Sequence, residues 1–158
     1  MPERKTTFLS LVIALVVTLC ATEGFAQSLA KDIVGAWALV KTNSYGPNPI
    51  GMFMFDGNGH FSANLERPDL PKYASNIRTQ GTAAEYKATV EGSIGFFGTY
   101  SVSGTDLNLH IVGSTFPNWI GTNQKRINLS IIGDELKFTQ PSPSQGGPAE
   151  DVISQRIK

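Results

Sequence analysis

Two basic side chains, His110 and Arg126, are the residues best suited to do chemistry in this sequence. An imidazole can transfer a proton near neutral pH, and a guanidinium can bind the oxygen of a carboxylate or an enolate. Together with the phenol of Tyr100 they could form an acid–base set of the isomerase or cyclase kind. Such a set would work only if the three side chains share one enclosed space.

The sequence around these residues leaves their direction open. His110 and Arg126 each alternate with aliphatic residues in the expected strands 106–114 and 124–132. The aliphatic rows are Leu107, Leu109 and Ile111 in the first strand, and Ile127, Leu129 and Ile131 in the second. The simpler interpretation places the aliphatic rows in the core and His110 and Arg126 in water, and we favour it. The alternative places both basic residues in a polar pocket.

Metal and covalent chemistry have little support. His60 follows a turn on the polar face of its strand, no metal-binding histidine spacing is present, and no Gly-x-Ser-x-Gly motif occurs. The single cysteine, Cys20, lies in a segment that we expect to be removed. We therefore expect no metal and no cofactor. Four acidic residues fall near the long loops and are most simply solvated charges, although a glycosidase-like pair stays open; they are Glu66, Asp69, Glu85 and Glu91.

A second group of candidates is aromatic and lies in the expected loops. The segment Phe116-Pro117-Asn118-Trp119 follows one strand, and Tyr73 and Tyr86 fall in another connection. Aromatic rings around one opening suit an apolar or aromatic small molecule, but the same rings could pack the loops on one another. The candidate ligand-binding residues are Tyr73, Tyr86, Tyr100, His110, Phe116, Asn118, Trp119 and Arg126.

The N-terminus predicts export. Arg4 and Lys5 precede the apolar run 8–21, and Gly24-Phe25-Ala26 has the small residues that a signal peptidase recognises. The run is short for ~30 Å of hydrocarbon, so we expect a signal peptide over 1–26, cleaved after Ala26, and a secreted or periplasmic domain over 27–158. The 13 basic and 13 acidic residues balance and form no basic patch, which argues against a nucleic-acid partner. No second apolar span follows.

Short apolar–polar alternations separated by turn residues predict an all-β, antiparallel domain. The expected strands are about 35–45, 51–55, 60–66, 95–103, 106–114, 124–132, 135–140 and 151–157. Thr82-Ala83-Ala84-Glu85 is a capping box, which predicts a short helix over about 83–91 in the loop after the third strand. The connections alternate between tight turns and long loops. This alternation favours an eight-stranded up-and-down barrel with a closed floor and an elaborated mouth over a sandwich.

In such a barrel the first and last strands are neighbours, so Trp37 and Arg156 should meet and seal the floor together with Gly35. The motif Gly35-Ala36-Trp37 with a closing Arg156 resembles the lipocalin superfamily. Further segments are similar to the bacterial lipocalin-like domain family; these are Gly51–His60, Phe96–Tyr100, His110 and Phe116–Arg126. One departure is Ser154, where the family often has an aromatic residue.

The resemblance implies a calycin barrel with an interior pocket. We expect the pocket to bind a small hydrophobic or amphipathic molecule. Two alternatives stay open: a small-molecule isomerase or cyclase that uses polar lumen residues, and a protein-interaction module that uses the mouth loops.

Overall fold

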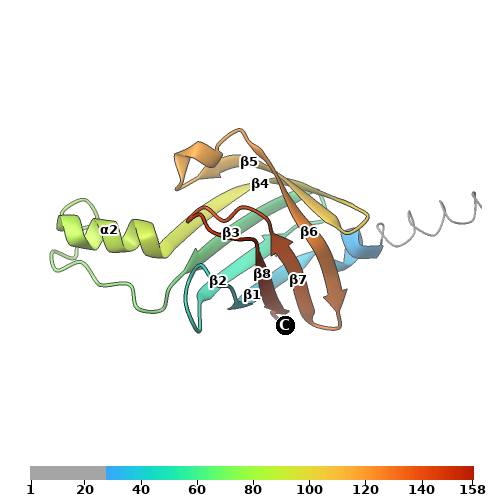
Figure 1. Ribbon diagram of the computed structural model, residues 1–158, viewed down its shortest axis with the longest axis horizontal. Coiled ribbons are helices and arrows are strands. Elements are labelled where there is room, and N and C mark those ends of the chain that lie inside the picture. The colour runs from blue at the N-terminus through green and yellow to red at the C-terminus, as the bar shows by residue number, and fades with distance from the viewer. Residues whose placement is uncertain (1–27) are drawn as a thin grey trace, which may run out of the picture.

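The computed structural model describes residues 28–158, which form a closed barrel of eight antiparallel strands (Figure 1). The predictions of a signal peptide over 1–26 and of cleavage after Ala26 concern residues outside the described part of the chain. Each strand pairs with the next in sequence, and β1 pairs with β8. The predicted fold class, an up-and-down barrel with a short helix after the third strand, is confirmed.

The strands follow the predicted ranges closely. They are β1 (Gly35–Lys41), β2 (Ile50–Phe55), β3 (His60–Glu66), β4 (Ser93–Ser103), β5 (Asp106–Ser114), β6 (Asn123–Ile132), β7 (Glu135–Gln140) and β8 (Glu150–Arg156). Helix α2 (Ala83–Gly92) begins at the capping box, in which Thr82 and Glu85 satisfy each other's backbone N–H groups. The first strand ends at Lys41 and not near 45, because residues 42–44 turn to bind a buried carboxylate described below.

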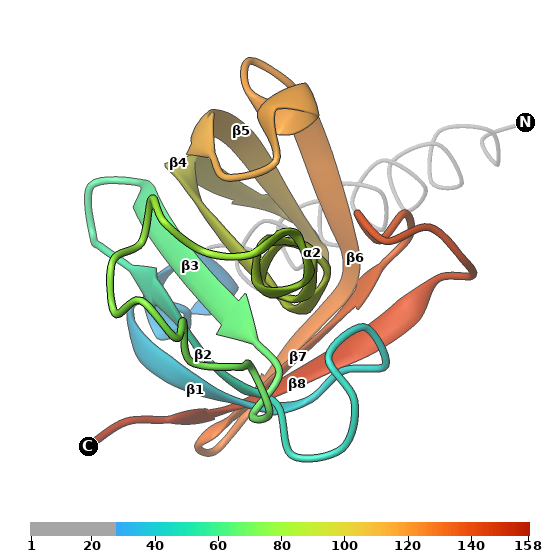
Figure 2. The same ribbon diagram turned by 90° about the vertical axis from the view of Figure 1, so that its left-hand side faces the viewer.

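Tight turns and long loops gather at opposite ends of the barrel. The floor carries the turns after β2, β4 and β6; in the first of these, Gly59 has a φ of +86°, which favours glycine. The mouth carries the four longer connections, one of which contains α2. Figure 2 looks onto this end, where α2 projects toward the viewer.

The floor is sealed as predicted. Trp37 is fully buried, and its Nε1 donates a hydrogen bond of 2.7 Å to the carbonyl of Ile33. The guanidinium carbon of Arg156 lies 4.0 Å from the centre of the Trp37 ring. Arg156 also donates to the carbonyls of Asp32 and Val34, at 2.6 and 2.9 Å, so it ties the chain before β1 to the end of β8. These contacts close the sheet on itself.

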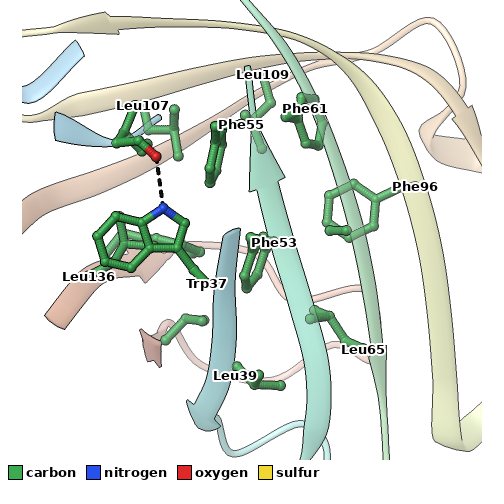
Figure 3. Packing of buried hydrophobic residues seen from close by; sticks show 14 of the residues in the cluster. Trp37, Leu39, Phe53, Phe55, Phe61, Leu65, Phe96, Leu107, Leu109 and Leu136 are labelled. Carbon is green, nitrogen blue, oxygen red and sulfur yellow. Dashed lines mark hydrogen bonds between the residues drawn. The ribbon is translucent and has the colours of Figure 1, made fainter. Parts of the chain in front are cut away.

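Aromatic rings fill the lumen next to the floor turns, and Figure 3 shows part of this cluster. Phe53 packs edge-on against Phe138 at 5.5 Å, and Phe55 packs edge-on against Tyr100 at 5.1 Å. Phe61 continues the same packing to Phe96 at 5.8 Å. These rings form a packed core that extends from the floor to Phe96, which also lines the cavity described below. Within residues 28–158, no helix has both the length and the apolar character needed to cross a bilayer.

Candidate ligand site at the mouth of the barrel

A β-bulge in β6 turns Arg126 into the barrel. Near the start of β6, Gln124 and Arg126 pair with the core residues Leu109 and Leu107. The register then shifts between Ile127 and Ser130, where Asn128 has a φ of 58°. A bulge inserts one residue and inverts the alternation of faces, so Leu129 is also buried. The favoured expectation that Arg126 lies in water is wrong for this reason.

The guanidinium of Arg126 is buried without a matching anion. Its side chain is only 3% exposed, and no carboxylate of the described residues lies within 4.0 Å of it. It donates to Oε1 of Gln124 at 2.7 Å and to the carbonyl of Lys125 at 3.4 Å. Burial lowers the pKa of Arg126 to about 10, which still leaves it charged at neutral pH.

Trp119 covers this guanidinium from the mouth loop. It ends the 3-10 helix η1 (Pro117–Trp119) between β5 and β6, and the guanidinium carbon of Arg126 lies 5.8 Å from its ring centre. The indole ring also packs edge-on against Phe96 at 5.2 Å and against Phe116 at 5.9 Å. It is half-buried, whereas Asn118 beside it is exposed. Trp119 thus acts as a plug across part of the mouth.

Below the plug lies a cavity of about 10 Å³, which is room for about one water molecule. One side is apolar and the other polar. The lining residues are Thr42, Ser44, Tyr45, Leu65, Ile94, Phe96, Trp119, Gln140, Ser144, Glu150 and Val152. The strand register relates this cavity to Arg126. Ile127 of β6 pairs with Thr139 of β7, so the preceding residue, Arg126, lies beside Gln140. Gln140 in turn pairs with Glu150 of β8. A row of three polar side chains therefore crosses the inner wall of β6, β7 and β8.

Glu150 is a buried carboxylate that is already satisfied. One of its oxygens accepts hydrogen bonds from Thr42 Oγ1 at 2.9 Å and from the backbone N–H groups of Asn43 and Ser44 at 2.6 and 3.0 Å. The other oxygen accepts from Ser44 Oγ. Next to it, burial raises the pKa of Tyr45 to about 12, and the charge of Glu150 adds to the effect. The negative charge of Glu150 is held by the β1–β2 loop and not by Arg126.

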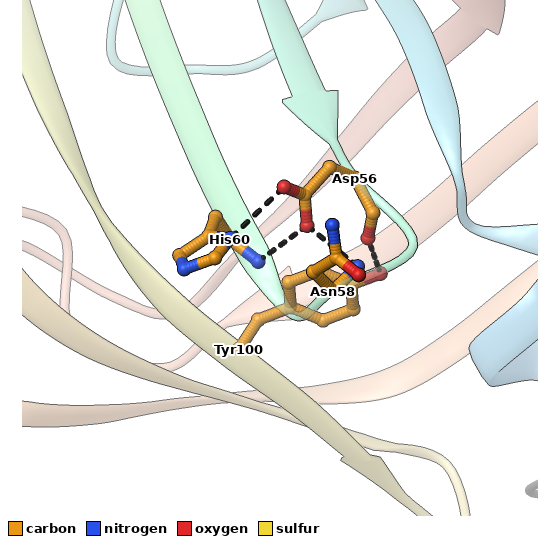
Figure 4. A network of polar contacts seen from close by, with 4 residues as sticks. All are labelled: Asp56, Asn58, His60 and Tyr100. Atoms are coloured by element: carbon orange, nitrogen blue, oxygen red, sulfur yellow. Dashed lines mark hydrogen bonds and ion pairs between the residues drawn. The ribbon is translucent and has the colours of Figure 1, made fainter.

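The remaining predicted residues do not join this site. His110 is exposed on the outer wall, where Nδ1 lies 2.9 Å from Oδ1 of Asn123. Tyr100 faces inward near the floor and donates to the carbonyl of Asp56 at 2.7 Å (Figure 4). His110, Tyr100 and Arg126 are therefore not brought together, and the acid–base set that the sequence left open is not assembled.

Tyr73, in the loop before α2, packs edge-on against Tyr86, in the first turns of α2, with ring centres 5.6 Å apart. Tyr73 donates to Thr89 at 3.1 Å, and the hydroxyl of Tyr86 accepts from the N–H of Gly81 at 2.8 Å. They stabilise the α2 loop and do not line the cavity. Conversely, sequence reasoning did not select Gln140 and Glu150, because each stands next to the Pro-rich loop 141–149 and resembles a solvated strand end.

A second hollow, of about 680 Å³, lies against the outer wall of β1–β5. Met54, Phe97 and Val112 line it and are each about half exposed. His60 and Asp56 stand at its edge, 2.9 Å apart, and this contact together with the backbone N–H of His60 lowers the pKa of Asp56 (Figure 4). No group of three His, Cys, Asp or Glu side chains within residues 28–158 is placed to hold a metal ion.

Comparison with known proteins agrees with this architecture. A curated relative is the 4'-hydroxy-3'-methoxypropiophenone carrier protein ppsC of Aspergillus oryzae (strain ATCC 42149 / RIB 40). It is 30% identical over 90 residues, which cover 52% of this chain and 80% of the relative. The model of the lipocalin-like domain family matches residues 34–155, from the turn before β1 to the end of β8. The chain therefore belongs to the lipocalin-like domain family.

Proposed function

We propose that this protein is an exported carrier that holds a small, largely aromatic molecule in the mouth half of its barrel. The observation that carries the proposal is the guanidinium of Arg126, buried beside Trp119 with no carboxylate within 4.0 Å among the described residues. An unpaired buried charge costs several kcal/mol, and such groups are concentrated at functional sites. A ligand that contacts Arg126 would supply the hydrogen-bond acceptor that this charge does not find in a carboxylate of the described residues.

The cavity must open to accept a ligand, because about 10 Å³ holds no organic molecule. Trp119 is the group to move, since it lies on a loop and is only half-buried. Its displacement would free the volume of an indole ring above Phe96. The packed rings of the floor half need not move. Binding would then select a minor open form of the mouth.

The chemistry of the opened space suits an aromatic ring with oxygen substituents. Phe96, Leu65 and Ile94 offer an apolar wall. Gln140 offers an N–H donor on the opposite wall, and Arg126, which does not line the closed cavity, offers N–H donors beside Trp119. The name of the relative describes a carrier of a phenolic aryl ketone, which is a molecule of this class.

A fluorescence titration tests the proposal. The protein, expressed with residues 1–158, is titrated with N-phenyl-1-naphthylamine, a neutral aromatic probe whose emission rises in an apolar site. We expect saturable binding, and at least about threefold tighter binding by Trp119→Ala, because the closed form no longer competes with the probe.

Two variants of the outer wall, Met54→Ser and Phe97→Ser, are the matched controls and should bind as the wild type does. The proposal is refuted if the probe gives no saturable signal. It is also refuted if the outer-wall variants abolish the signal while Trp119→Ala leaves it unchanged, since the probe would then occupy the hollow beside Met54.

A further inference from the structure

The guanidinium of Arg126 has unused capacity for hydrogen bonds. A guanidinium carries five N–H donors, and Arg126 makes one short bond, to Gln124, and one long bond, to Lys125. On the side of Trp119, the guanidinium carbon lies 5.8 Å from the centre of the indole ring. This distance is near the outer limit for a cation–π contact. No nitrogen of Arg126 is both fully buried and without a hydrogen-bond partner. The guanidinium nevertheless lacks an anion among the described residues and keeps spare N–H donors.

The surrounding charges decide what kind of group fits there. Within residues 28–158, Glu150 is the one buried carboxylate, and both of its oxygens accept hydrogen bonds from residues 42–44. Gln140 stands between it and Arg126. An anionic group on a ligand would be repelled at the Glu150 end and attracted at the Arg126 end, so its position and direction in the cavity are fixed.

We infer that the natural ligand is an aromatic anion of the carboxylate type, with its charged group on Arg126 and its ring in the space that Trp119 vacates. The inference rests on the proposed function and names the ligand class of the same site. A buried guanidinium binds a planar carboxylate through two parallel N–H···O bonds, which no neutral oxygen can match in strength. The free-energy cost of burying the charge of Arg126 would therefore be offset only in the complex with such a ligand.

A matched pair of probes separates this inference from the proposed function. 1-Anilinonaphthalene-8-sulfonate has the ring system of N-phenyl-1-naphthylamine with one added anionic group. We expect the wild type to bind the sulfonate more tightly than the neutral probe. Arg126→Met should weaken sulfonate binding roughly 10- to 100-fold, the worth of hydrogen bonds to a charged partner, and change neutral-probe binding less than about threefold.

Lys125→Met is the control, because Lys125 is the next residue on the strand, carries the same charge and lies exposed against Asp106 at 2.9 Å. It should leave both affinities within about twofold. Arg126→Lys keeps the positive charge but lacks the planar guanidinium, so it should retain part of the affinity for the sulfonate. It replaces Arg126→Met as the test variant if Arg126→Met does not fold.

Each outcome is decisive. Loss of sulfonate binding in Arg126→Met alone supports the inference. Equal binding of both probes by wild type, Arg126→Met and Arg126→Lys overturns it and leaves the proposed function standing. If neither probe gives saturable binding to the wild type, the proposed function fails and the inference fails with it.

Discussion

Replacement of Arg126 by methionine should make the protein more stable. Burial lowers the pKa of Arg126 from its ordinary 12.5 to about 10, which corresponds to about 3 kcal/mol against the charged form in the folded state. The substitution also removes the bond to Gln124 and the contact with Trp119, which together contribute about 2 kcal/mol. Methionine is of similar length and apolar. The free energy of unfolding should therefore rise by about 1 kcal/mol, and Tm by about 4 °C.

The assay is urea unfolding at neutral pH without ligand, followed by circular dichroism. Arg156→Met at the floor is the matched comparison, because that guanidinium lies 4.0 Å from Trp37 and donates two short bonds to Asp32 and Val34. The same substitution should there lower the free energy of unfolding by about 3 kcal/mol, because it removes two bonds and a closer ring contact. A loss of more than about 1 kcal/mol in Arg126→Met would refute the reasoning, since it would mean that the fold itself uses the charge.

Three further predictions concern the floor of the barrel, the buried Tyr45 and the N-terminus. Trp37→Ala should cost about 3–5 kcal/mol in urea unfolding, because the ring is fully buried and seals the floor; a cost under about 1 kcal/mol would contradict the seal. Tyr45 has a pKa raised to about 12, so the unfolded state loses its phenolic proton first and stability falls as the pH rises from 10 to 12. At pH 11 the loss is about 1.4 kcal/mol, and Tyr45→Phe should lack it when both proteins are unfolded at pH 8 and pH 11. If the protein is exported as we propose, N-terminal sequencing of the secreted or periplasmic fraction should begin at Gln27, and a sequence that begins upstream of Gln27 would contradict cleavage after Ala26.

The barrel could be predicted from the sequence because its strands obey local rules. His60–Glu66 alternates strictly, and the turn before it contains glycines that permit a tight hairpin. The meeting of Trp37 and Arg156 followed from topology alone, since an even number of up-and-down strands returns the chain to the floor. The strand alternation and the turn depend on residues that are close in sequence, and the contact of the first and last strands depends on the number of strands. Both can be obtained from the sequence.

The site could not be predicted because it depends on a break in those rules. The segment Ile127-Asn128-Leu129 fits a regular strand, and only the bulge at Asn128 allows Arg126 and Leu129 to be buried together. Glu150 presents the same difficulty. Its partners, Thr42 to Ser44, are more than 100 residues away, so no local pattern marks it as a buried group.

A crystal structure of the protein with 1-anilinonaphthalene-8-sulfonate would locate the ligand site directly. We expect the sulfonate within hydrogen-bond distance of Arg126, the naphthalene ring against Phe96, and the indole of Trp119 displaced from its present position. A probe bound on the outer wall over Met54 and Phe97, with Trp119 still in place over a closed lumen, would contradict the proposed site.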